Sequence, residues 1–323
     1  MSETEIRLGP GREFDRIRAI AVRLGAGAPH LGDDCAVLSE GEGRVVVSTD
    51  LSVEAVHFRR DWLTQEEIGY RTATAALSDL AAAGASCIGL LAAVSAPHDS
   101  PASDLVALMA GVGDAVAAVG GSVLGGDLTA APQWIVSITV LGRARCPMSR
   151  HGAAPGDGIW VTGALGGARS ALVTWQAGRT PDAGSRAAFA RPVARIGAGQ
   201  WLAAHGARAM MDVSDGVAGD VGHLAAASGV AIDLRLESLP RHPTVEAAAK
   251  LTGIAPEALA AEGGEDYEIL VALPPSFTEA DAAACLRDCG VPLTRIGDAR
   301  AGEGVRLLLR GEPIVLHGYD HFS

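Results

Sequence analysis

Short apolar runs that alternate with helical segments are the feature that most constrains the fold of this chain. Helical patterns cover residues 12–24, 64–84, 101–119 and 216–229, among others. The runs with the composition of strands include DCAVL (34–38), RVVVSTD (44–50), SCIGLLAAVSAP (86–97), QWIVSITVLGRA (133–144), IWVTG (159–163), VAIDLRL (230–236) and YEILVAL (267–273). Because such alternation is typical of α/β proteins, we expect that fold class.

The first long helix carries its own start signal. Thr64 is followed three residues later by Glu67, which is the spacing of a capping box, and the helical pattern ends near Gly84. Asp79 lies inside the apolar part of this helix, in AALSDLAAAGA. A carboxylate there has no capping role, and its desolvation is unfavourable without a partner. We therefore expect a function for Asp79.

The length of the chain indicates two domains. Its 323 residues are about twice the common length of one domain. The segment CPMSRHGAAPGDG (146–158) is rich in Pro and Gly, and it is the best candidate for a domain boundary. We expect an N-terminal domain over residues 1–148 and a C-terminal domain over residues 149–323.

The charged residues restrict the partners. The formal net charge is −12, which argues against general binding of nucleic acid. Lys250 is the only lysine, and it lies in the ordinary helical context TVEAAAKLTG. A Walker A loop needs a lysine in GK[ST], so that nucleotide-binding motif is excluded. If the chain handles nucleotides, arginine, backbone amides and metal ions must do it.

The cysteines and the apolar runs indicate the compartment. Five cysteines without CxxC spacing favour a reduced, cytoplasmic protein. No run reaches 18 uninterrupted apolar residues, and the start of the chain has no apolar signal core. We expect neither secretion nor a membrane span.

Aspartates follow strand-like runs or flank glycine in GDDCAVL, STDLSVEAVHF, VLGGDLT, MMDVSDG and GGEDYE. A carboxylate at the carboxyl edge of a strand in an α/β sheet points into the crevice where ligands bind. Mg²⁺ prefers oxygen ligands, which Asp and neighbouring Ser or Thr hydroxyls provide. One Gly-Asp turn alone is most often a cap or an Asx-turn. Several such turns together predict a magnesium site.

These motifs, with LSDLAAAGA, PGDGIWVTGALGGA, DVSDGVAGDVGHLA, GGEDYEIL and GYDHF, resemble the thiamine-monophosphate kinase family in order and over nearly the whole chain, from about residue 12 to 322. The wider superfamily includes aminoimidazole ribonucleotide synthetase, and its members use ATP without a Walker loop. The resemblance implies two α/β domains with mixed sheets. It also implies a homodimer formed through the N-terminal sheet, and an active site that the C-terminal domain completes.

The resemblance also implies roles for individual residues. The implied magnesium ligands are Asp34, Ser48, Thr49, Asp50, Asp79, Asp127, Asp212 and Asp215, of which Asp79, Asp127 and Asp212 are also implied to be catalytic. The implied ATP contacts are Gly126, Asp127, Arg150 and Ser214, and the implied contacts to thiamine monophosphate are His57, Glu265 and Tyr319.

Four of these side chains also have plain structural interpretations. Arg150 suits an exposed loop, His57 suits packing against its strand, Glu265 suits a strand cap and Tyr319 suits an aromatic anchor. The implied reaction is Mg²⁺-dependent transfer of the ATP γ-phosphoryl group to thiamine monophosphate, which gives thiamine diphosphate and ADP. The alternatives are another ATP-dependent synthetase of the superfamily or a non-catalytic nucleotide-binding regulator on the same fold.

Overall fold

The chain divides into two compact units in a computed structural model that describes residues 19–20, 22–25 and 43–319. The N-terminal unit ends at Arg145 and lacks residues 81–85, which belong with the C-terminal unit from Cys146 onward. Within the described residues, no helix combines the length and the apolar character needed to cross a bilayer.

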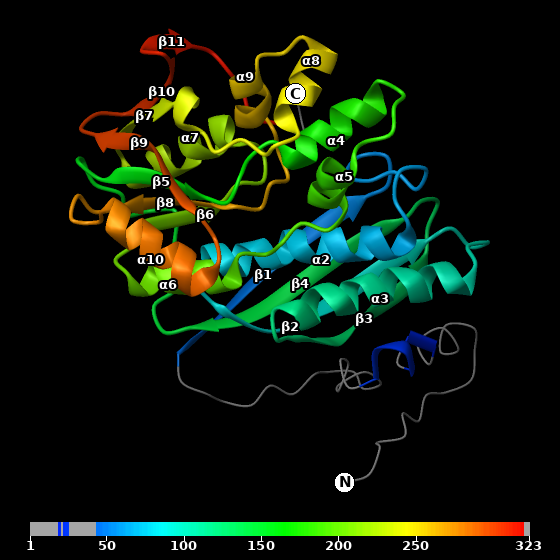
Figure 1. Cartoon of the computed structure of the whole chain (residues 1–323). Helices are drawn as coiled ribbons and strands as arrows, with labels where there is room; N and C mark the ends of the chain where they lie inside the picture. The colour runs from blue at the N-terminus through cyan, green and yellow to red at the C-terminus, as the bar shows by residue number, and fades with distance from the viewer. Residues whose placement is uncertain (1–18, 21, 26–42, 320–323) are drawn as a thin grey trace. The chain divides into compact units, whose positions relative to one another are not determined.

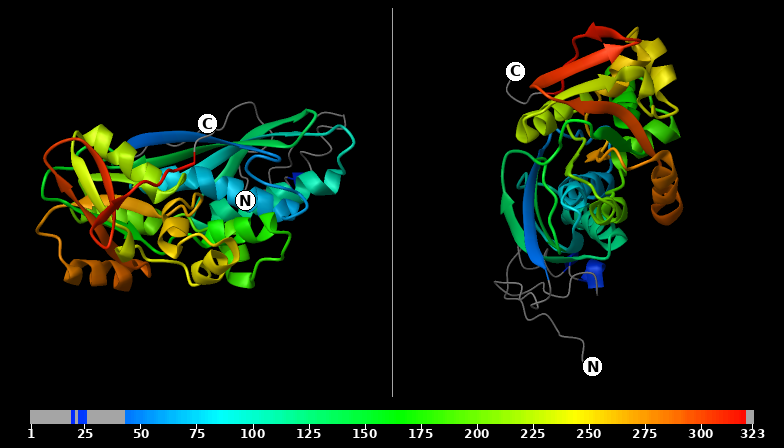
Figure 2. Two further views of the ribbon diagram at one scale, coloured as in Figure 1. Left: turned by 90° about the horizontal axis from the view of Figure 1, so that it is seen from above. Right: turned by 90° about the vertical axis from the view of Figure 1, so that its left-hand side faces the viewer.

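A four-stranded sheet in the order β1-β4-β2-β3 forms the N-terminal unit. The outer pair β2 and β3 is parallel, whereas β4 is antiparallel to both of its neighbours. Helices α2 and α3 run along the same face of this sheet (Figures 1 and 2). The elements are β1 (Arg44–Val53), α2 (Gln65–Ala82), β2 (Ser86–Ala96), α3 (Ala102–Ala118), β3 (Ser122–Ala130) and β4 (Ile135–Ala144).

Glycine lets the two helices pack closely. A Cβ atom at Gly69 of α2 would lie 1.8 Å from the carbonyl oxygen of Leu108, and one at Gly111 of α3 would lie 1.9 Å from that of Glu66. The capping box is confirmed, because the Thr64 amide donates to Glu67 Oε2 at 2.9 Å and the Glu67 amide donates to Thr64 Oγ1 at 3.2 Å. This packing and this cap fix the helix that carries Asp79.

The two faces of this sheet differ because side chains alternate along a strand. Val136, Ile138 and Val140 of β4 are fully buried on the helix-covered face. The opposite face, which we call the open face, carries large apolar side chains that remain exposed. These are Val45 (50% exposed), Val47 (60%), Leu51 (54%) and Leu91 (36%).

A seven-stranded mixed sheet in the order β11-β10-β7-β9-β5-β8-β6 forms the C-terminal unit. Among the pairs of these described strands, only β7 and β10 are parallel. The strands are β5 (Gly158–Thr162), β6 (Ala209–Asp212), β7 (Ala231–Arg235), β8 (Ile269–Leu273), β9 (Leu293–Arg300), β10 (Gly304–Leu309) and β11 (Glu312–Ile314). Strands β5, β6 and β8 are buried along their whole length.

Helices pack against this sheet and bury a core that includes Val161, Val221 and Leu270. The helices of this unit are α4 (Gly167–Gln176), α5 (Ala183–Ala190), α6 (Ile196–Ala204), α7 (Val217–Ser228), the short 3₁₀ helix η2 (Leu236–Ser238), α8 (Val245–Thr252), α9 (Pro256–Ala261) and α10 (Glu279–Cys289), of which α8 packs on α4 and α9. The mixed α/β class expected from the alternating pattern and from the resemblance is confirmed.

Three elements were not expected from the sequence, namely β3, α5 and α10. Two expectations lie wholly or mainly outside the described residues. These are the strand over 34–38 and most of the helix over 12–24, of which residues 19–20 and 22–24 are described and are helical.

Candidate functional site

An acidic turn (residues 212–216) joins β6 to α7 in the C-terminal unit. Asp212 is the last residue of β6 and is 8% exposed. The turn continues through Ser214 and Asp215, and Gly216 then begins α7 with a φ of 99°, which favours glycine. Asp212 and Asp215 therefore lie where the sequence predicts them, at the end of a strand and in the turn that follows it.

Two further segments bind this turn through their backbones. In the Glu265 loop (residues 262–268), the Glu265 amide donates to the carbonyl oxygen of Ser214 at 2.7 Å, and the Tyr267 amide donates to that of Val213 at 2.9 Å. The Tyr319 amide donates to the carbonyl oxygen of Asp215 at 2.9 Å. Four predicted site residues, Ser214, Asp215, Glu265 and Tyr319, thus come together from three separate segments.

Glycine makes this convergence sterically feasible. A Cβ atom at Gly264 would lie 2.7 Å from the carbonyl oxygen of Ser214, and one at Gly318 would lie 2.9 Å from the Cα atom of Gly219. Both contacts are too short for any side chain. Glycine in GGEDYE and GYDHF is therefore needed for close approach of the backbone.

Asp220 is a member of this acidic cluster that the sequence reasoning missed. It lies in the first turn of α7 and is 1% exposed, and its carboxylate accepts a hydrogen bond from the Asp215 amide at 3.3 Å. Burial raises the pKa of Asp220 to about 8, and the nearby charges of Asp212 and Asp215 act in the same direction. The argument that singled out Asp79 does not extend to Asp220, because an acidic residue in the first turn of a helix is an ordinary stabilising feature.

A buried ion pair supports the Glu265 loop. Glu268 is 3% exposed, and its carboxylate accepts from Arg195 Nε at 2.8 Å and from Arg195 Nη2 at 2.6 Å. The Thr162 hydroxyl donates to the same carboxylate at 2.7 Å. The Glu268 carbonyl oxygen accepts from the amide of Val213, so the residue that carries the ion pair also binds the acidic turn.

In the N-terminal unit, a hydrogen bond joins two predicted magnesium ligands. Ser48 Oγ in β1 donates to Asp79 Oδ2 in α2 at 2.5 Å. Both residues are half-buried. The bond places Ser48 on the helix-covered face of the sheet, and it provides the partner that a carboxylate inside an apolar helix requires.

Neighbouring residues of β1 point to opposite faces. Thr49 follows Ser48 and lies on the open face, where its hydroxyl is 2.9 Å from that of Thr139 in β4. Asp50 is half-buried and shares the helix-covered side with Ser48. The run Ser48-Thr49-Asp50 therefore does not present all three of its side chains on one face.

Asp127 lies within a strand, which corrects the expectation of an acidic turn there, and the strand expected to end at Asp50 continues to Val53. Asp127 is exposed in β3, opposite Ala93 of the parallel strand β2. The sequence VLGGDLT suggested a turn because of its two glycines, but the segment pairs with β2 through a register shift at Gly125. Gly126 packs so closely that its Cβ would lie 1.9 Å from the carbonyl oxygen of Ala92.

The strand order separates two of the predicted ligands. Thr49 lies on β1 and Asp127 on β3, which are the two edge strands of the four-stranded sheet. Three strand spacings of about 4.8 Å place their backbones about 14 Å apart. Both side chains lie on the open face, in neighbouring rows of the register.

The remaining predicted residues lie as follows. His57 closes a tight turn after β1, where its Nδ1 accepts from the Val53 amide at 3.1 Å. Arg150 is exposed in the C-terminal unit, and its carbonyl oxygen accepts from Ser228 Oγ at 3.2 Å. Asp34 lies outside the described residues. Within the part of the chain that the structure describes, no group of three or more His, Cys, Asp or Glu side chains is arranged to hold a metal ion.

Two family models match the chain. The model "AIR synthase related protein, N-terminal domain" matches residues 32–144, and "AIR synthase related protein, C-terminal domain" matches residues 154–310. Together they cover most of both units.

The chain is also similar to curated and solved proteins. It is 35% identical over 309 residues to a thiamine-monophosphate kinase from Halobacterium salinarum, covering 94% of this chain and 99% of the relative. It resembles the crystal structure of thiamine-monophosphate kinase from Stenotrophomonas maltophilia K279a, with a TM-score of 0.79, 30% identity and coverage of 93% and 96%. It also resembles AaThiL complexed with AMPPCP and TMP, with a TM-score of 0.78, 28% identity and coverage of 99% and 100%.

These matches extend over both units and include the motifs that build the acidic turn and the Glu265 loop. The chain therefore belongs to the AIR synthase related protein family and, within it, to the thiamine-monophosphate kinases.

Proposed function

We propose that this protein transfers the γ-phosphoryl group of ATP to the phosphate of thiamine monophosphate, giving thiamine diphosphate and ADP. The observation that carries the proposal is the joining of the acidic turn, the Glu265 loop and Tyr319 by backbone hydrogen bonds. These are motifs by which the chain resembles the kinase family, and a similar structure holds AMPPCP and TMP.

The acceptor needs little chemical activation. A phosphate monoester has a second pKa of about 6, so near neutral pH it is already an anion and requires no general base. The difficulty is the repulsion between two phosphate-bearing substrates. The residues of this chain therefore act mainly by positioning the substrates and neutralising their charge.

The predicted metal ligands fit Mg²⁺ by their chemistry, since they offer carboxylate and hydroxyl oxygens. We assign this role to Asp34, Ser48, Thr49, Asp50, Asp79, Asp127, Asp212 and Asp215. Mg²⁺ usually takes one or two carboxylates and completes its shell with water and substrate phosphates. A site in which only one or two of the assigned carboxylates meet is therefore compatible with Mg²⁺. When bound, the ions would neutralise the negative charge on the phosphates. In a chain with one lysine, arginine is otherwise the main side chain that can do so.

Among the assigned ligands, we give Asp79, Asp127 and Asp212 the catalytic role. Asp79 is already oriented by Ser48, and Asp212 is held at the end of a buried strand. By binding Mg²⁺, these carboxylates would fix where the phosphate groups lie. The reaction requires no proton transfer from them.

We assign the substrate contacts by the same motifs. Gly126, Asp127, Arg150 and Ser214 contact ATP, and His57, Glu265 and Tyr319 contact thiamine monophosphate. Exposed Arg150 offers a planar fork to phosphate. The Glu265 carboxylate suits the cationic thiazolium ring, and Tyr319, which is 57% exposed, is available to stack on it.

We also propose that two copies pair through the open face of the N-terminal sheet, in the cytoplasm. Val45, Val47, Leu51 and Leu91 leave an apolar surface there that association would cover. On this proposal, the N-terminal domain (1–148) dimerises and supplies ATP and metal contacts, and the C-terminal domain (149–323) completes the active site.

The test is a transfer assay with [γ-³²P]ATP, thiamine monophosphate and Mg²⁺, with the products separated by chromatography. We expect labelled thiamine diphosphate, and we expect none when Mg²⁺ is replaced by EDTA. A folded protein that forms no labelled product in the presence of Mg²⁺ would contradict the proposal. It would instead favour a sister synthetase or a nucleotide-binding regulator on this fold.

A further inference from the structure

Two residues of the Glu265 loop have a backbone conformation that L-amino acids rarely adopt. Glu265 has a φ of 66° and Tyr267 a φ of 51°, and neither is a glycine. Such conformations persist only where the surroundings hold them. Asp266 lies between these two residues in the chain. The loop is stabilised by contacts with two different segments, the acidic turn and the start of α4.

On one side the loop is held by the acidic turn. The amides of Glu265 and Tyr267 donate to the carbonyl oxygens of Ser214 and Val213 at 2.7 and 2.9 Å. The intervening residue directs its side chain elsewhere. The backbone thus fixes the two strained residues while leaving the Asp266 carboxylate available for a second anchor.

On the other side Asp266 binds the start of α4, 100 residues earlier in the chain. The Gly166 amide donates to Asp266 Oδ1 at 3.0 Å and to Oδ2 at 2.9 Å. Gly166 is the N-cap position of α4, with a φ of 84° and no side chain to cap the helix itself. Asp266 therefore supplies from a distance the cap that this helix lacks.

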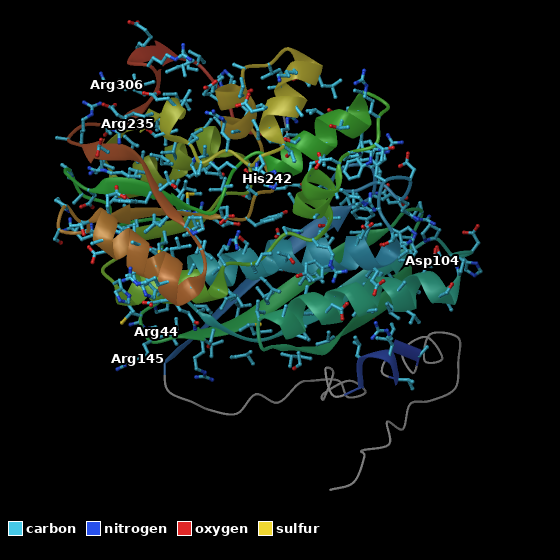
Figure 3. All side chains as sticks on the ribbon, in the orientation of Figure 1. Arg44, Asp104, Arg145, Arg235, His242 and Arg306 are labelled. Atoms are coloured by element: carbon cyan, nitrogen blue, oxygen red, sulfur yellow. The ribbon has the colours of Figure 1, made fainter. Side chains whose placement is uncertain are left out.

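The backbones also meet directly at this anchor. A Cβ atom at Gly263 would lie 3.4 Å from the Cα atom of Gly166, and one at Gly167 would lie 3.0 Å from the ring of His242, which Figure 3 labels. Burial raises the pKa of Asp266 well above its ordinary value, and the nearby charges of Glu268 and Glu265 act in the same direction. Asp266 as a whole is half-buried, and its carboxyl group is close enough to that of Glu265 for the two charges to interact.

We propose that Asp266 is a positioning residue for Glu265. By clamping the loop between the acidic turn and the N-terminus of α4, it holds Glu265 in its strained conformation and aims the Glu265 carboxylate at the thiazolium part of thiamine monophosphate. This inference rests on the proposed function, which assigns Glu265 to that substrate. On this proposal, Asp266 itself contacts neither substrate.

The experiment compares Asp266→Ala and Asp266→Asn with a matched control, Asp182→Ala. Asp182 is the N-cap of α5 in the same unit and accepts from the amides of Gly184 and Ser185 at 2.9 and 3.1 Å. Both aspartates thus cap a helix, but only Asp266 belongs to the Glu265 loop. Steady-state KM values for thiamine monophosphate and for ATP are measured for each variant, with thermal unfolding as the check on folding.

We expect Asp266→Ala to raise KM for thiamine monophosphate on the order of 10-fold while KM for ATP stays within about 2-fold. Asp266→Asn keeps an acceptor oxygen and should recover most of the loss. Asp182→Ala should lower the melting temperature and leave both KM values unchanged. Equal changes in both KM values for Asp266→Ala, or the same pattern in Asp182→Ala, would overturn the inference.

A double-mutant measurement decides the matter independently. In a Glu265→Ala background, the further change Asp266→Ala should not alter KM for thiamine monophosphate, because the side chain to be positioned is gone. A further rise in KM in that background would overturn the inference. If Asp266→Ala does not fold, Asp266→Ser, whose side chain is too short to reach Gly166, takes its place in both backgrounds. Wild-type turnover is measured first, so that failure of the proposed function is recognised separately, as absence of thiamine diphosphate from the unmodified protein.

Discussion

Ser48 Oγ donates a hydrogen bond to Asp79 Oδ2 at 2.5 Å, and so connects the edge strand β1 with helix α2. The bond holds the Asp79 carboxylate in one orientation before any ligand arrives, which is how hydrogen bonds act on carboxylates in metal sites.

Replacing Asp79 or Asp212 by Asn should abolish turnover and leave the fold nearly intact. The amide has the shape of the carboxylate but not the charge that we assign to binding the phosphate-associated cations. The measurement is the transfer assay together with thermal unfolding. Asp99→Asn, at an exposed turn, is the control and should keep wild-type activity. Full activity in both site variants would show that the acidic site is misplaced.

Gly163 should be intolerant of a side chain because of the buried ion pair beside it. A Cβ atom there would lie 1.8 Å from Glu268 Oε1, at a backbone φ of 61°. Gly163→Ala should therefore displace Glu268 from Arg195 and cost about 3–5 kcal/mol, as expected for breaking a buried pair.

The control for this prediction is Gly178→Ala. Gly178 has a similar φ of 70°, but no atom lies within 4 Å of the point that its Cβ would occupy. The substitution should cost only about 1 kcal/mol, which is the backbone effect alone. Urea unfolding of both variants separates the two contributions, and equal losses would mean that the ion pair tolerates displacement.

Asp233 should make stability depend on pH. Figure 3 labels Arg306 of β10 and Arg235 of the neighbouring strand β7, which also carries Asp233. The Asp233 carboxylate accepts from Arg306 Nε at 2.8 Å and from Arg300 Nη2 at 2.5 Å. The hydrogen bond from Arg306 is the main cause that lowers the pKa of Asp233, and Arg300 adds to it.

Because the folded-state pKa lies below the unfolded one, the stabilisation is complete above about pH 4 and is lost as the pH falls through the folded-state value. Asp233→Asn should cost about 1 kcal/mol at pH 7, since both arginines are partly exposed. Thermal unfolding at pH 7 and pH 3 checks this. A difference from wild type that persists undiminished at pH 3 would refute the assignment.

Val47→Glu should weaken the proposed dimer. Val47 is 60% exposed on the open face, and a charge there would have to be desolvated on association. Light scattering after size exclusion should report a shift toward monomer. Val193→Glu is the control, because Val193 is 54% exposed in the C-terminal unit and should leave the mass unchanged. A dimer that survives Val47→Glu would place the contact elsewhere.

Local signals predicted local structure well. The capping box of Thr64 and Glu67 and the strand-to-turn passage at Asp212 could be identified because each depends on a few adjacent residues. Strand β3 could not be identified, because Gly125 and Gly126 are typical of a turn. What keeps that segment extended is its pairing with β2, which a linear pattern does not contain.

Contacts between distant segments of the site could not be predicted from the sequence either. The bond between Ser48 and Asp79 spans 31 residues, and that between Gly166 and Asp266 spans 100. Sequence reasoning identified Asp79 from its unfavourable environment but could not identify its partner. Asp220 could not be identified from the sequence, because an acid in the first turn of a helix is ordinary and its burial beside Asp212 depends on the packing of α7 onto β6.

The separation of Thr49 and Asp127 across the open face decides whether the two residues can bind the same metal ion. Mg²⁺ holds its ligands at about 2.1 Å, so two oxygens on one ion lie at most about 4 Å apart. Strands β1 and β3 are separated by two others, and neither side chain is long enough to cross them. A single sheet can thus offer these two residues to two different ions, but never to the same one.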